Sequence, residues 1–350
     1  KSNIEIDVAS YNTESKEFSL KMISGQLDPK DIGVFYSPIS DLSEMLSFEI
    51  IADGQLPTAN LNKLSLQYGA DTQFEITGMI SDYSDFNNSD LKVDVSSLSV
   101  SQSDLESIIR VFANEYYSPT QLTALGDLNL NLQAVGKLNG FHYDSYIVTE
   151  QGNVTINGTG RITDKFKYLS FEGPVRVEDI QIANIIGDGA GLGNTTMSAN
   201  AKVVIPRDSL LSVTAKGVIE SLTYKDCFYN DINFNGIYLG NNVSANLNMD
   251  SPLNQFDING DITFGDSLGF IVDGNVQRLN LSPFILMETW NTPLLTTQIE
   301  ANMSGTTIDD MTGTLVIDNT SIVDSNFIYN PGPIYLQALA DAGEGKKLQI

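Results

Sequence analysis

Apolar and polar residues alternate along most of the chain. In one run, Leu128, Leu130 and Leu132 are separated by single asparagine residues. Successive side chains of a β-strand point to opposite faces, so this run places its leucines on one face and its amides on the other. Similar runs recur from one end of the chain to the other, with turn-forming residues between them. The pattern predicts an all-β protein of antiparallel strands joined by short loops.

Helical patterns are short and few. The clearest one covers residues 104–112, where Ser103 and Glu106 have the spacing of a capping box. Residues 28–32 and 282–287 are weaker candidates, each with a proline where the first helical turn tolerates one. We therefore expect helix only in short pieces.

The chain also repeats itself. A shift of 82 residues superimposes three segments without a gap, those that begin at Gly54, Gly78 and Val93 on those that begin at Gly136, Gly160 and Val175. A further copy, with a longer insertion, includes Gly260 and Val276. In the last strand of each copy the apolar spacing loses its parity, as between Val95 and Leu98, which predicts a β-bulge. A short helical segment follows each of these strands, at residues 104–112, 182–186 and 282–287.

Such repeats predict one elongated sheet. A single repeat cannot bury its apolar face alone, so neighbouring repeats must share a sheet, and their unequal spacing argues against a closed propeller. We expect one continuous array over residues 1–350, with approximate repeats at 1–47, 48–127, 128–196, 197–294 and, in part, 295–350.

Composition excludes several classes of function. The chain has 44 acidic and 19 basic residues and a formal charge of −25, which disfavours nucleic acid and anionic lipid surfaces. It contains no run of about 18 to 20 apolar residues that would span a bilayer as a helix. Its first residues lack the apolar core of a signal peptide, so we expect any membrane anchor to lie outside this fragment. The single cysteine, Cys227, cannot form an internal disulfide.

Residues with catalytic or metal-binding chemistry are scarce. His142 is the only histidine, which excludes a multi-histidine metal site. The glycine-rich segment 187–193 leads into a strand pattern, whereas a phosphate-binding loop would lead into a helix, so we interpret it as a connector. Asp188 and the pair Asp309 and Asp310 lack the spacing of a calcium loop. We therefore predict that the protein is not an enzyme and has no metal or cofactor.

These repeats resemble the AsmA-like superfamily and, within it, the TamB family of translocation and assembly module subunits, in a form similar to Bacteroidetes homologues. The resemblance rests on strand starts of the form Gly-x-Leu or Gly-x-Ile and on the strand that leads into a helical turn. Those strand starts carry Gly54, Gly78, Gly136, Gly160 and Gly260. The resemblance implies an elongated antiparallel sheet curled lengthwise into a U-shaped trough with an apolar interior.

The same resemblance implies a function and a location. Members of this family are anchored in the inner membrane, cross the periplasm and are associated with a BamA-like outer-membrane barrel protein. Their proposed work is to carry phospholipid between the membranes or to assist the assembly of outer-membrane proteins. Residues expected to line a lipid groove are Phe74, Ile76, Val93, Val95, Leu128, Leu130, Leu132, Val154, Ile156, Val175, Val177, Val243, Leu247, Phe256 and Ile258.

Two alternatives stay open from the sequence. The apolar faces of two sheets can pack together as a dry sandwich, which would leave no room for acyl chains. The acidic, Asn-rich strands also suit a surface adhesin or a glycan-binding β-protein. A glycan-binding protein typically exposes several tryptophans in loops, and this chain has only Trp290, which favours the lipid conduit.

Overall fold

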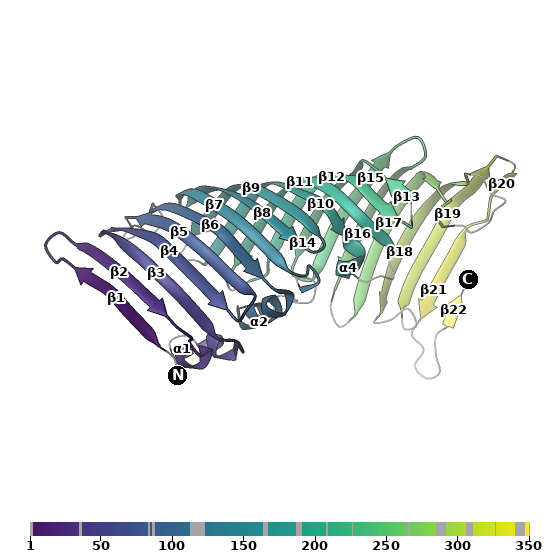
Figure 1. Cartoon of the computed structure of the whole chain (residues 1–350). Coiled ribbons are helices and arrows are strands. Elements are labelled where there is room, and N and C mark those ends of the chain that lie inside the picture. The colour runs from purple at the N-terminus through teal and green to yellow at the C-terminus, as the bar shows by residue number, and fades with distance from the viewer. Residues whose placement is uncertain are drawn as a thin grey trace. The chain divides into compact units, whose positions relative to one another are not determined.

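A computed structural model of the chain describes residues 3–349, except residues 35–36, 83–84, 86–87, 113–122, 164–166, 187–190, 208, 226, 265–266, 285–291, 306–310, 326 and 340–346. The chain is all-β, and its strands form a long antiparallel meander with few short helices (Figure 1), as predicted. Its contacts divide it into two compact units, residues 1–190 with 202–210, and residues 191–201 with 211–350.

The first unit contains ten strands that pair in chain order, followed by part of an eleventh. These strands are β1 (Ile4–Tyr11), β2 (Glu17–Ser24), β3 (Leu46–Gln55), β4 (Thr58–Tyr68), β5 (Thr72–Ser81), β6 (Asp90–Val100), β7 (Leu128–Lys137), β8 (Gly140–Thr149), β9 (Gly152–Thr163), β10 (Tyr168–Gln181) and β11 (Leu192–Pro206). Its helices are α1 (Pro29–Ile32), the 3-10 helix η1 (Ser37–Asp41), α2 (Gln102–Phe112) and α4 (Ile182–Ile186).

The second unit takes the first part of β11 and continues the meander. Its other strands are β12 (Ser212–Tyr224), β13 (Cys227–Tyr229), β14 (Ile232–Leu239), β15 (Asn242–Asp250), β16 (Gln255–Thr263), β17 (Leu268–Asn280), β18 (Leu294–Gly305), β19 (Thr312–Asp324), β20 (Phe327–Tyr329), β21 (Ile334–Leu339) and β22 (Lys347–Gln349). The short strands β13 and β20 extend the ends of β12 and β19, while β14 and β21 pair with the remainder of those two strands.

The 82-residue repeat corresponds to four strands and a helix. In sequence, the 82-residue shift aligns β3 to β6 and α2 with β7 to β10 and α4. The predicted helical segment 182–186 is α4. The predicted loss of parity is confirmed in two strands, because the register shifts between Val95 and Leu98 in β6 and between Val276 and Leu279 in β17. A bulge adds a residue to one strand of a pair, which explains why the apolar spacing changes there from two to three.

Two predicted helices form close to where the sequence placed them. In α1, the side chain of Asp28 accepts a hydrogen bond from the backbone N–H of Lys30 (3.0 Å), and proline occupies the first turn. The capping residue predicted for α2 is wrong. The helix begins two residues earlier, and Ser101 Oγ accepts from the backbone N–H of Asp104 (3.3 Å), so Ser101, not Ser103, has the capping role.

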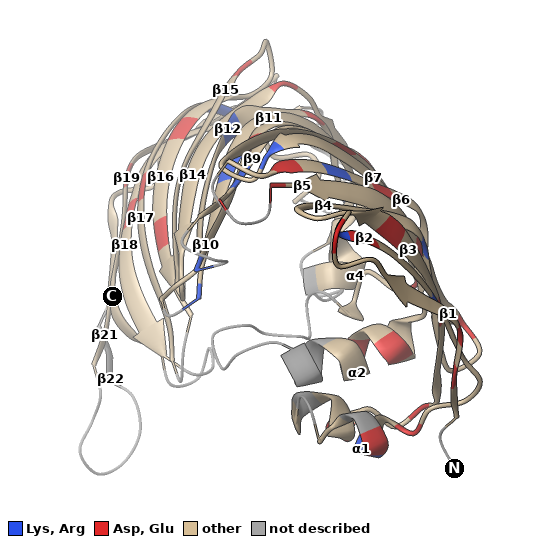
Figure 2. Ribbon diagram, turned by 90° about the vertical axis from the view of Figure 1, so that its left-hand side faces the viewer, with Lys and Arg blue, Asp and Glu red and all other residues tan. Residues whose placement is uncertain are grey.

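The helices cover only one end of the sheet's apolar face in the first unit. There, Leu27, Leu42, Leu46 and Tyr68 form a buried cluster, and Ile108 of α2 packs against it. Figure 2 shows the acidic positions of α1 and α2, which contribute to the negative charge of this end. The Thr72 hydroxyl donates to Oδ2 of Asp104 (2.7 Å), a buried contact that ties β5 to α2.

The expected U-shaped trough is not what the structure has. The sheet is open, since the described strands of each unit pair with near neighbours along the chain, and it is not strongly curled. Alternation determines which face a side chain occupies, but curvature depends on bulges and on what packs against that face. Because the helices and η1 pack at one end only, nothing in the described part of the first unit draws the two ends of its strands together.

Candidate lipid-binding face

The ladders collect the apolar residues of each unit on one side of its sheet, which we call the apolar face. In the first unit one row crosses eight adjacent strands, because each of its members is the direct cross-strand partner of the next. From β3 to β10 this row is Phe48, Leu66, Phe74, Leu98, Leu130, Ile147, Val154 and Val177.

The second unit has an equivalent row. From β12 to β21 its members, again direct cross-strand partners, are Gly217, Phe234, Leu247, Ile258, Gly274, Ile299, Ile317 and Ile334. Among the described ladder positions on the apolar face of either unit, Asp324 at the end of β19 is charged, and the others are neither acidic nor basic. Each unit therefore presents an uncharged stripe that crosses its strands.

Every residue that the sequence placed in a lipid groove lies on the apolar face of its own unit. Those up to Val177 lie on the first unit, and Val243, Leu247, Phe256 and Ile258 lie on the second. Some are direct neighbours, as Ile76 pairs with Val95 and Val95 pairs with Leu132. Their shared face follows from strand parity together with the correct register.

Most of the apolar face is only partly covered. Among the residues expected to line a groove, Val95 (6% exposed) and Val177 (7%) are buried, and the others are intermediate. The chain has an accessible surface of 20779 Å², against about 14,000 Å² for a compact monomer of this mass. In the described residues of each unit, extensive strand contacts are those between hydrogen-bonded neighbours, so no second sheet covers the apolar face there as a dry sandwich would require.

An aromatic cluster on this face was missed by the sequence analysis. Phe141, Tyr143 and Phe171 meet edge to face, with ring centroids 5.5 to 6.5 Å apart. The Phe141 ring lies over Gly160, where an added Cβ would be 2.3 Å from ring carbons. Phe141 and Tyr143 share parity in their strand, which was a usable signal, but the glycine that makes room for the ring is identified only by the register of β8 with β9.

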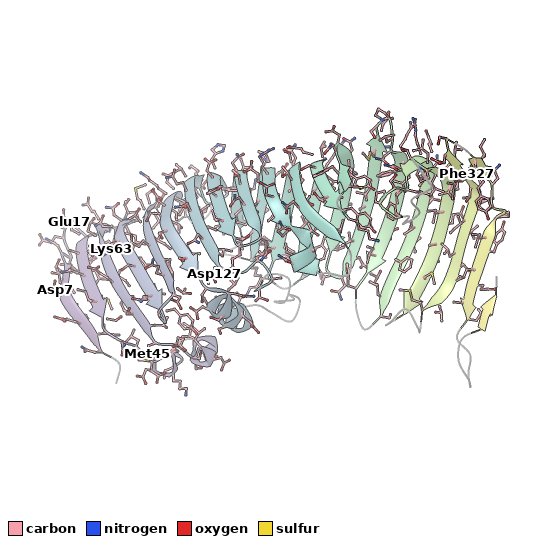
Figure 3. All side chains as sticks on the ribbon, turned by 45° about the vertical axis from the view of Figure 1, so that its right-hand side comes forward. Asp7, Glu17, Met45, Lys63, Asp127 and Phe327 are labelled. Carbon is pink, nitrogen blue, oxygen red and sulfur yellow. The ribbon has the colours of Figure 1, made fainter. Side chains whose placement is uncertain are left out.

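The polar face carries the charged groups. Lys21 pairs with Asp7 (2.5 Å) and Lys63 with Glu49 (2.6 Å), and both lysines have their pKa raised, first by hydrogen bonds to these carboxylates. Figure 3 labels Lys63 and Asp7 on the ribbon. Hydrogen bonds from two asparagine amides lower the pKa of Asp53 on this face. These contacts keep charge in solvent, on the side opposite the apolar face.

Two tyrosines on the apolar side have a raised pKa because they are buried, unlike the charged groups of the polar face. Burial raises the pKa of Tyr143, and burial is also the largest cause that raises the pKa of Tyr229. The Tyr229 hydroxyl is buried and has no hydrogen-bond partner in the described structure. It belongs to a cluster with Ile232 and Met249, which was also missed because β13 is only three residues long. A buried phenol of this kind favours its neutral form.

The residues considered for other chemistry do not form a site in the described part of the chain. His142 is exposed on β8. No group of three or more potential metal ligands comes together among the described residues. Gly193 lies in β11, which begins at Leu192, so the last two residues of the expected connector are strand.

Several predictions fall on residues that the structure does not describe. Asp188, Asp309, Asp310 and Trp290 lie outside the described residues. So does half of the predicted helix at 282–287, of which residues 282–284 form a turn.

No described helix is long and apolar enough to cross a membrane. Comparisons with protein-family models, with curated proteins and with solved structures found no match for this chain.

Proposed function

We propose that this chain is a non-enzymatic part of a bacterial envelope protein and that its apolar face binds phospholipid acyl chains. The observation that carries the proposal is the uncharged row from Phe48 to Val177, which crosses eight strands without a second sheet over it. Soluble proteins rarely leave a contiguous apolar surface of this extent uncovered unless it binds something.

The dimensions of the face suit acyl chains. Adjacent strands lie about 4.8 Å apart, so the eight-strand row extends over about 34 Å. One leaflet contributes half of the roughly 30 Å hydrocarbon core, so three or four strands match the length of one acyl chain. Because the face is open along its side, a lipid can shift from strand to strand while its headgroup stays in water.

The wider role follows from the resemblance to the AsmA-like superfamily. In this proposal the protein is anchored in the inner membrane and this chain lies in the periplasm. It carries phospholipid between the membranes or assists outer-membrane protein assembly, together with a BamA-like barrel protein. The net charge of −25 is consistent with a polar face that stays hydrated while lipid occupies the other face.

Photo-crosslinking in cells tests this proposal in the whole protein. A photoreactive residue at Leu130, on the apolar face, should crosslink to phospholipid. The same residue at Asn129, its neighbour on the polar face, should not, although both lie in β7. Absence of lipid crosslinks at Leu130, Phe74 and Leu247 alike would overturn the proposal.

A second candidate, glycan binding, has one specific observation in its favour. A hollow on the polar face is lined by Asn131, Gln133, Asp144 and the exposed Tyr146, beside the bulge of β6. Amides, a carboxylate and an aromatic ring are groups that hold sugars by hydrogen bonds and stacking. Binding to an oligosaccharide array that is lost in Tyr146→Ala would support this candidate, and binding that persists in that variant would count against it.

A further inference from the structure

One end of the second unit carries exposed apolar side chains on two hairpins of the same design. In the first hairpin Thr223 of β12 pairs with Phe228 of β13, and in the second Val323 of β19 pairs with Ile328 of β20. The two lie 100 residues apart in sequence. The side chain of Phe228 is 74% exposed and that of Ile328 is 68% exposed.

Three more exposed aliphatic or aromatic side chains lie at this end. The ladders place the β15–β16 turn, with Leu253 (47% exposed), and the turn after β17, with Phe284 (46%), at the same end of the sheet as β13. Tyr329, on the second hairpin, is 57% exposed. We call Phe228, Leu253, Phe284, Ile328 and Tyr329 the rim.

The rim is continuous with the apolar face. The Phe284 ring contacts that of Tyr224, with centroids 5.1 Å apart, although β12 and β17 are separated by three strands. Tyr224 in turn packs with the buried cluster around Tyr229 and Met249 on the apolar face. A hydrocarbon chain that leaves a bilayer at the rim would thus reach the apolar face past the rings of Phe284 and Tyr224.

We propose that the rim inserts into the interface of a zwitterionic phospholipid bilayer, so that lipid enters or leaves the apolar face at this end. The inference rests on the proposed function. Aromatic and aliphatic side chains that project from a protein end are the groups that partition into a membrane interface. Along the strands, the polar face carries mostly polar residues, such as the cross-strand pair Asn233 and Asn248. At the two hairpins the same face carries Phe228 and Ile328 instead.

Charge decides which membrane surface is suitable. A net charge of −25 repels anionic headgroups, so binding must come from apolar insertion. Lys225, in the turn of the first hairpin, lies over the Tyr224 ring, with its Nζ 5.4 Å from the ring centroid. Insertion without electrostatic attraction predicts that vesicle binding changes little with salt concentration.

Flotation with phosphatidylcholine vesicles tests the rim. The unmodified chain should float with the vesicles at low and at high salt, and the double variant Phe228→Asp with Ile328→Asp should bind at least tenfold more weakly. Ile271→Asp is the matched control, because Ile271 is 52% exposed on the polar face of the same unit, away from the rim. Failure of the unmodified chain to float, or equal binding by the double variant, would overturn the proposal.

A second measurement separates this inference from the proposed function. Binding of a fluorescent fatty acid, without vesicles, reports on the apolar face alone. The rim double variant should bind the fatty acid as the unmodified chain does, whereas Leu130→Asp should reduce that binding and leave flotation intact. A chain that floats but never binds the fatty acid would refute the proposed function and leave the rim as a membrane contact. Circular dichroism confirms that each variant is folded.

Discussion

The substitution Leu130→Asp tests whether the apolar face is open, because the loss of stability caused by a charged side chain depends on its access to water. Leu130 lies in the middle of the eight-strand row, between Leu98 and Ile147, and is only partly buried. Asn129→Asp is the matched control, since it adds the same charge one residue away on the exposed polar face. Both variants lie in the same strand and add the same charge, so a difference between them reports on the face alone.

The structure sets the expected magnitudes. Burial of a whole leucine side chain contributes about 1.5 to 3 kcal/mol, so a partly buried one contributes about 1 to 2 kcal/mol. The aspartate carboxylate can turn toward solvent on an open face, so we expect Leu130→Asp to lower the free energy of unfolding by about 2 kcal/mol. Under a second sheet the unpaired carboxylate would bring the loss to about 3 to 5 kcal/mol or more. Asn129→Asp should change the free energy of unfolding by about 0.5 kcal/mol or less.

Urea unfolding measures the loss of stability, and fatty-acid binding on the same samples measures the loss of affinity. Leu130→Asp should weaken binding of a fluorescent fatty acid at least tenfold, which corresponds to about 1.4 kcal/mol, while most of the protein stays folded. Asn129→Asp should leave the affinity unchanged. Unaltered affinity in Leu130→Asp would refute an acyl-chain site on this face, and a loss of stability above about 4 kcal/mol would refute an open face.

Three further predictions concern the scaffold. Tyr229→Phe should raise the free energy of unfolding by about 1 kcal/mol in urea titrations, since it removes a buried hydroxyl without a partner; a loss of similar size would show that the hydroxyl is hydrogen-bonded. Thr72→Val should lower it by about 1 to 3 kcal/mol, because the buried carboxylate of Asp104 loses its donor, and unchanged stability would contradict the importance of that contact. The pKa of Tyr143 is higher in the folded state than in the unfolded chain, so its contribution to the free energy of unfolding is complete below about pH 10 and is lost as pH rises through the folded pKa. The urea midpoint should therefore fall less steeply at alkaline pH in Tyr143→Phe, and an unchanged slope would contradict this.

Sequence alternation alone determined the fold class and the membership of the apolar face. Residues such as Leu128, Leu130 and Leu132 share a face in any strand, because the side-chain period of two is a property of the backbone. The repeat likewise located the bulge between Val95 and Leu98, since an extra residue must break the parity of the pattern. These features are local, and a single sequence is enough to predict them.

Only the tertiary structure decided which strands meet and what covers their faces. Cross-strand register placed Phe141 over Gly160 and joined separate apolar runs into a row across eight strands, and no local pattern encodes such pairings. The curvature of the sheet and the exposure of Phe228 and Ile328 depend on what packs against each surface, which is a sum over distant residues. That is why alternation identified the apolar residues correctly, yet the trough expected from the resemblance was wrong.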